Sequence, residues 1–109
     1  MYVDTASTRW MVRELGKTPR NSAEWIKKYR DRIIFGSDLS VGEKEADRRY
    51  WATRLWSQRV FWETMLIEQL PFKDEDEVNG SSNIKGLGLP QDTIDRIYYR
   101  NAYEFFAIR

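Results

Sequence analysis

Asp38 is the residue whose position in this sequence is most typical of chemistry. It follows the apolar run Ile33–Phe35 after only Gly36 and Ser37. A short apolar run without polar alternation predicts a strand buried in a parallel sheet, and ligands bind at the carboxyl ends of such strands. The pattern therefore places an acidic side chain where a ligand could bind. The simpler interpretation is a loop residue that caps the next helix.

The composition limits what this carboxylate can do. The chain contains no Cys, which excludes disulfides, thiolate metal sites and a cysteine nucleophile. It also contains no His, the usual general base and the commonest metal ligand. Any metal bound by this chain alone would have only oxygen ligands from its side chains, and we expect no cofactor for the chain alone.

Charge and hydropathy exclude further classes of function. Eighteen Lys and Arg residues against seventeen Asp and Glu residues leave a formal charge of +1, so nucleic acid and anionic membranes are not expected partners. We find no apolar run that could span a bilayer and no secretion signal at the N-terminus. We therefore expect a soluble, cytoplasmic chain, with residues 1–109 forming one domain or part of one.

The segments before Asp38 are expected to follow the order strand, helix, helix, strand, which places Asp38 after the second strand. They are a strand at Met1–Asp4, a helix capped by Ser7 or Thr8 and ended by Gly16, a helix opened by the capping pair Asn21 and Glu24, and a strand at Ile33–Phe35. This order predicts a right-handed crossover between two parallel strands.

The segments after Asp38 are predominantly helical in pattern. A long helix is expected over about 43–70, ended by Pro71, with a core-facing apolar stripe at Trp51, Leu55, Trp62 and Leu66. A polar loop follows at 73–82. Pro90 opens a last helical region that breaks near Asn101, which we expect to be a buried amide bonded to backbone where two short helices meet.

Three segments together resemble the C-terminal part of the amidohydrolase-related family. They are YVDTAS at 2–7, RDRIIFGSD at 30–38 and GLGLPQDTIDRIYYRNAYEFF at 86–106, of which FGSD and LP-x-x-x-I-x-x-I-Y-x-x-N-A are the most specific. The family includes metal-dependent hydrolases and non-oxidative decarboxylases such as aminocarboxymuconate-semialdehyde decarboxylase. The resemblance implies an α/β fold, a partial (β/α)8 TIM barrel that keeps its last two strands and its C-terminal helices and is mostly helical by residue count. A complete barrel needs about 200 residues or more, so residues 1–109 would be a C-terminal fragment.

The resemblance also implies a role for Asp38 as a metal-site and catalytic residue. In the family the matching acid binds a divalent metal, often zinc, or helps to activate its water. The family's His ligands have no counterpart here. The resemblance thus implies a chain that is inactive alone and that needs an N-terminal barrel chain, or copies of itself, as a partner.

Two other functions remain open. The chain could be a non-catalytic interaction module that docks through exposed strand edges and an aromatic helix. Alternatively, Asp4 and Asp38 could face each other at neighbouring strand ends as an acid–base pair, although Asp4 is more simply a structural hydrogen-bonding residue. The sequence indicates neither the substrate nor whether the reaction is hydrolysis or decarboxylation.

Overall fold

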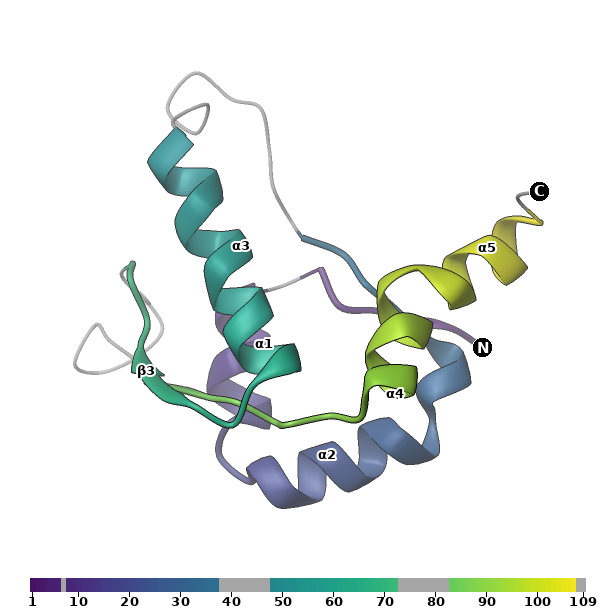
Figure 1. The fold of residues 1–109 in the computed structure, drawn as a ribbon, viewed down its shortest axis with the longest axis horizontal. Helices are drawn as coiled ribbons and strands as arrows, with labels where there is room; N and C mark the ends of the chain where they lie inside the picture. Colours follow the sequence, from purple (N-terminus) through teal and green to yellow (C-terminus); the bar gives the residue numbers. More distant parts are fainter. Residues whose placement is uncertain (7, 38–47, 73–82, 108–109) are drawn as a thin grey trace.

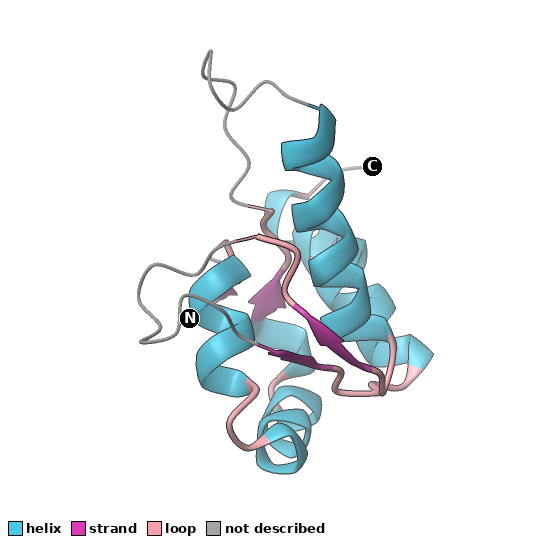
Figure 2. Ribbon diagram, turned by 90° about the vertical axis from the view of Figure 1, so that its left-hand side faces the viewer, coloured by secondary structure: helices cyan, strands magenta, loops and turns pink. Residues whose placement is uncertain are grey.

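Helices pack against two short pairs of strands in this protein (Figures 1 and 2). The computed structural model describes residues 1–6, 8–37, 48–72 and 83–107. The first elements are β1 (Val3–Asp4), α1 (Thr8–Leu15), α2 (Pro19–Lys28), the 3-10 turn η1 (Arg30–Arg32) and β2 (Ile33–Ile34). They are followed by α3 (Arg48–Glu63), β3 (Ile67–Gln69), β4 (Asn83–Lys85), α4 (Gln91–Asp95), the π-helical turn η2 (Arg96–Arg100) and α5 (Asn101–Phe106).

The predicted parallel pairing of the first two strands is confirmed. Val3 lies opposite Ile33, and Asp4 lies opposite Ile34, with α1 and α2 forming the connection between the strands. Helix α1 ends before Gly16, as expected. Helix α2 begins at Pro19, earlier than the predicted capping pair, because proline suits the first helical position, where no backbone donor is needed.

The predicted partial (β/α)8 barrel is wrong. Strand β2 has β1 on one side, but its other side is covered by the C-terminal helical segment. There Asn101 Nδ2 donates to the Ile33 carbonyl at 2.8 Å, and the Phe35 amide donates to the Ile97 carbonyl at 2.9 Å. These backbone groups would pair with the next strand of a barrel. Instead, the strands of the described residues form two separate sheets of two strands each.

The second sheet is an antiparallel pair that the sequence analysis missed. Strand β3 pairs with β4 in the register Ile67 to Lys85 and Gln69 to Asn83. The long helix predicted to reach about residue 70 therefore ends earlier, at Glu63. An extended ladder with a distant segment is not visible in a local apolar pattern, which is why the pattern favoured a continuous helix.

The chain that leaves β4 also closes the C-terminal end of α3. The Leu87 amide donates to the Phe61 carbonyl and the Gly88 amide to the Thr64 carbonyl, both at 2.9 Å. These bonds satisfy carbonyls that a helix end leaves without an intrahelical donor. The approach is close: a Cβ atom at Gly86 would lie 2.0 Å from the Thr64 carbonyl oxygen. Only glycine fits at that point.

One hydrophobic core joins the two halves of the chain. Its buried apolar side chains include Met11, Val12, Ile26, Ile33, Val60, Phe61, Trp62, Leu70, Ile84, Leu87, Leu89, Ile94 and Ile97. The apolar stripe predicted for the long helix over about 43–70 is therefore only partly core. Trp62 is buried, whereas Leu55 and Leu66 are exposed.

Asn101 is buried where η2 meets α5, as predicted. Its side-chain amide donates to the backbone carbonyls of Ile33 and Arg30, so one residue ties the last helix to the start of β2. The Asn101 Oδ1 atom has no partner among the described residues. The side chain is therefore held through its donor group.

No helix within the described ranges combines the length and the apolar content that crossing a bilayer would require.

Candidate functional site

The carboxyl ends of β1 and β2 form a small hydrogen-bonded junction. Because the two strands are parallel, the segments that follow them leave the sheet at the same edge. The Thr5 amide donates to the Ile34 carbonyl at 3.1 Å, and the Gly36 amide donates to Thr5 Oγ1 at 3.0 Å. This junction, Asp4–Ala6 with Ile34–Ser37, leads directly to the predicted site residue.

Asp38 itself lies outside the described residues, so its predicted role as a metal ligand and catalytic residue stays a prediction. The same holds for the carboxylate pair of Asp4 and Asp38. Among the residues that the structure does describe, no three His, Cys, Asp or Glu side chains gather into a group that could hold a metal ion.

Asp4 has a structural role at the end of β1. Its carboxylate Oδ1 accepts a hydrogen bond from the Ala6 amide at 2.7 Å, which turns the chain away from the strand. This agrees with the simpler of the two interpretations of Asp4 in the sequence.

Gln58 is the junction residue that sequence reasoning missed. It lies on α3, is almost fully buried, and its Nε2 donates to the Gly36 carbonyl at 3.2 Å. Its Oε1 accepts from the Trp62 indole nitrogen at 3.0 Å. A glutamine four residues before a tryptophan, and therefore on the same face of the helix, was the available signal, since buried amides need partners. Helix α3 therefore positions the segment that leads to Asp38.

Replacing Gly36 by alanine should destabilise this junction. A Cβ atom there would lie 2.4 Å from Asp4 Oδ1 and 2.8 Å from Ala6 Cβ. We expect the free energy of unfolding to fall by about 1–3 kcal/mol, as for other overpacked sites, measured by urea denaturation. In an Asp4→Ala background the same substitution should cost less, because one of the clashing atoms is gone. Equal costs in both backgrounds would contradict the described contact.

A second cluster of titratable side chains fastens η2 to α3. Arg59 Nε donates to Glu63 Oε2 at 2.9 Å, and the Tyr98 hydroxyl donates to the same oxygen at 2.9 Å. The hydrogen bond from Arg59, aided by the one from Tyr98, holds the pKa of Glu63 below its ordinary value of 4.5. Burial, followed by the bond to Glu63, raises the pKa of Tyr98 well above its ordinary 10.0.

These shifts predict how stability varies with pH. The Glu63 contribution is present above pH 4.5 and is lost as the pH falls through the lowered pKa of the folded state. The Tyr98 contribution is present below pH 10.0 and is lost above it, because the unfolded chain then releases the phenol proton first.

Tyr98→Phe should abolish the Tyr98-dependent loss of stability at alkaline pH. It should also lower the free energy of unfolding at pH 7 by about 1 kcal/mol. Denaturation curves measured from pH 3 to pH 11 test both the acid-side and the alkaline-side loss of stability. Tyr103→Phe, an exposed tyrosine, is the matched control and should change neither. If Tyr98→Phe lost stability at alkaline pH as the unmodified chain does, Tyr98 would not be the cause of that loss.

Comparison of the chain with protein-family models, with curated proteins and with solved structures gives no match. The resemblance to the amidohydrolase-related family therefore rests on the sequence motifs alone.

Proposed function

We propose that this chain is a segment of an amidohydrolase-like metal-dependent hydrolase or non-oxidative decarboxylase, and that it works in the cytoplasm. In this proposal Asp38 contributes one carboxylate to a divalent metal, zinc by preference. One carboxylate cannot hold a catalytic zinc, which typically needs three protein ligands, and the chain has no His and no Cys to supply the others. The remaining ligands must therefore come from a partner chain, and the segment is inactive alone.

The parallel strand junction is the observation that supports this proposal. Two neighbouring parallel strands end at one edge, where α/β enzymes bind their ligands. The bonds from Gly36 to Thr5 and from Gln58 to Gly36 fix the backbone close before Asp38. A ligand for a metal must be held in place by such supporting bonds.

Reconstitution tests the proposal. The chain is mixed with the histidine-bearing N-terminal part of an amidohydrolase-related enzyme, and hydrolysis and carbon dioxide release are measured with added zinc. We expect activity that a chelator removes and that Asp38→Asn reduces by about 100-fold or more. Asp31→Asn, an exposed acid at the opposite end of β2, is the matched control and should keep full activity.

The nucleotide sequence upstream of Met1 provides a second test. An H-x-H motif in the same or an adjacent reading frame would support a divided enzyme. Full activity of Asp38→Asn in the reconstituted mixture would remove this residue from the mechanism. Absence of both the motif and any metal-dependent activity would overturn the proposal.

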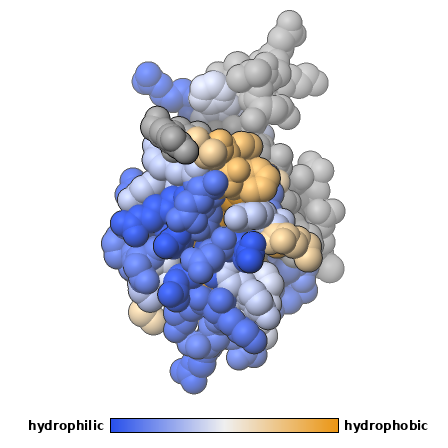
Figure 3. Space-filling view, turned by 90° about the vertical axis from the view of Figure 1, so that its right-hand side faces the viewer, coloured by the Kyte–Doolittle hydropathy of each residue, from blue (hydrophilic) through white to orange (hydrophobic). Residues whose placement is uncertain are grey.

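The exposed apolar side chains favour a second candidate, a non-catalytic interaction module. Near the N-terminus and on α5 the exposed group comprises Met1, Tyr2, Phe105 and Phe106, and the Tyr2 and Phe105 rings lie 4.7 Å apart. Figure 3 shows an apolar patch, in orange, on the face that carries this end of the molecule. Contiguous apolar surface is typical of interaction sites.

Size-exclusion chromatography with light scattering tests this second candidate. A self-associating or partner-bound species is expected, and Phe106→Ser should weaken it. A cooperative monomer that binds nothing would count against this module and against an obligate partner.

A further inference from the structure

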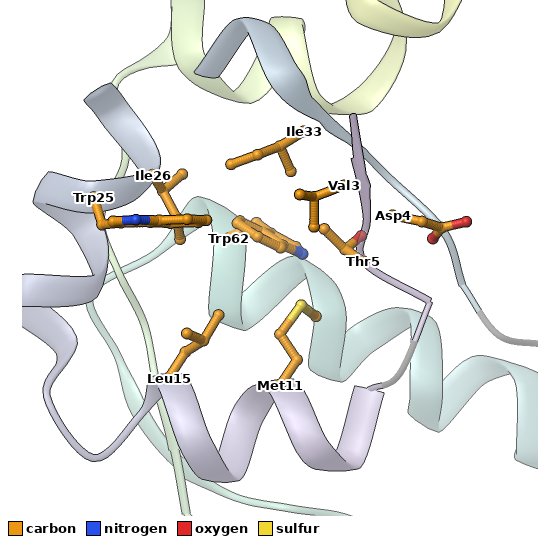
Figure 4. A pocket seen from close by; sticks show the side chains of 9 residues that line it. All are labelled: Val3, Asp4, Thr5, Met11, Leu15, Trp25, Ile26, Ile33 and Trp62. Atoms are coloured by element: carbon orange, nitrogen blue, oxygen red, sulfur yellow. The ribbon is translucent and has the colours of Figure 1, made fainter. Parts of the chain in front are cut away.

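An apolar pocket lies between the β1–β2 sheet and the helices, and its lining includes Asp4 and Thr5 at the carboxyl end of β1. Figure 4 shows Val3 and Ile33 on the sheet side, Met11 and Leu15 on the side of α1, and the Trp25 and Trp62 rings at the level between them. The pocket has a volume of about 170 Å³. An apolar cavity of about 150 Å³ is known to stay dry and to bind benzene, so this pocket has the size of a single ring.

The pocket leads from solvent into the core. Trp25 is 48% exposed and Val3 is 43% exposed, whereas Ile33 and Trp62 are at most 2% exposed. The Trp25 ring also contacts the Tyr29 ring, with centroids 5.2 Å apart. A ligand can therefore reach the pocket past Trp25 and Val3 without displacing a core side chain.

The polar side chains beside the pocket each make a hydrogen bond within the protein. The Trp62 indole nitrogen donates to Gln58, and Thr5 Oγ1 accepts from the Gly36 amide. The Asp4 carboxylate accepts from Ala6 and points away from the pocket in Figure 4. A charged or strongly polar ligand would lose its hydration here without gaining replacement bonds.

We propose that this pocket binds a compact, uncharged aromatic ring. Aliphatic side chains and two indoles supply dispersion contacts and ring-edge contacts, and the pocket volume limits the ligand to about one ring. The proposal does not rest on the proposed metal chemistry, since the pocket uses neither Asp38 nor a partner chain.

Titration of the full chain with benzene, followed by NMR of its methyl groups, tests the pocket. We expect saturable shifts with an affinity of about 1 mM, and contacts from benzene protons to the Ile33 and Leu15 methyl groups. Benzoate should bind at least about tenfold more weakly, because its carboxylate must be desolvated. No saturable shift up to the solubility of benzene, or equal binding of benzoate, would overturn the proposal.

Substitutions that fill the pocket test whether benzene binds there. Val3→Phe places a ring at the mouth of the pocket and should weaken benzene binding by about tenfold or more. Ile67→Phe, an exposed β-strand residue outside the pocket, is the matched control and should bind like the unmodified chain. Should Val3→Phe not fold, Leu15→Phe fills the same space from α1. Unchanged binding in whichever of these two variants folds would overturn the assignment.

The readouts separate this inference from the proposed function. Benzene binding is measured without metal or partner, and reconstituted activity is measured without benzene. Either one can fail while the other succeeds.

Discussion

Trp62→Ala is expected to lower the free energy of unfolding by about 3–5 kcal/mol, the range for deleting a large buried aromatic side chain. Trp62 is 1% exposed and its ring lies 5.1 Å from that of Phe61 in the core. The substitution also removes the indole N–H group that donates to Gln58 Oε1, and with it one buried hydrogen bond. Urea denaturation followed by circular dichroism measures the change.

Two variants separate the contributions at this site. Trp56→Ala removes a tryptophan from the same helix, but this side chain is 43% exposed, so its cost should be clearly smaller than that of Trp62→Ala. Trp62→Phe keeps a buried ring but loses the indole N–H group, and we expect an intermediate cost. Equal costs for Trp62→Ala and Trp56→Ala would contradict the placement of Trp62 in the core.

Asn101→Ala is the second substitution with a large expected effect. Asn101 donates to the Ile33 and Arg30 carbonyls from a fully buried position. Asn101→Ala leaves both carbonyl groups without this donor. We therefore expect the free energy of unfolding to fall by about 2–3 kcal/mol. Thermal and urea unfolding measure the change.

The matched control for Asn101 keeps the shape and removes the donor. Asn101→Asp places a carboxylate opposite two carbonyl oxygens, so it should destabilise the chain at least as much as Asn101→Ala at pH 7 and less at low pH, where a protonated carboxyl can donate one bond. If Asn101→Asp were as stable as the unmodified chain at pH 7, the amide would not be acting as a donor here.

Local sequence signals determined several parts of this protein. The order of apolar runs and turn residues was enough to predict that β1 and β2 are parallel, because a crossover of two helices leaves few other arrangements. A single amide in an apolar face was enough to predict the buried role of Asn101. Gly16 predicted the end of α1.

Tertiary structure decided the features that depend on distant segments. Strand β3 exists because β4 pairs with it, and the C-terminal end of α3 is capped by Leu87 and Gly88; no local pattern contains either partner. The bonds of Asn101 and Ile97 to β2 cover the edge where a barrel would continue, so family-like motifs led to the wrong fold class. Backbone groups bond with whichever partner the packing brings near, and a sequence read along its length does not specify that partner.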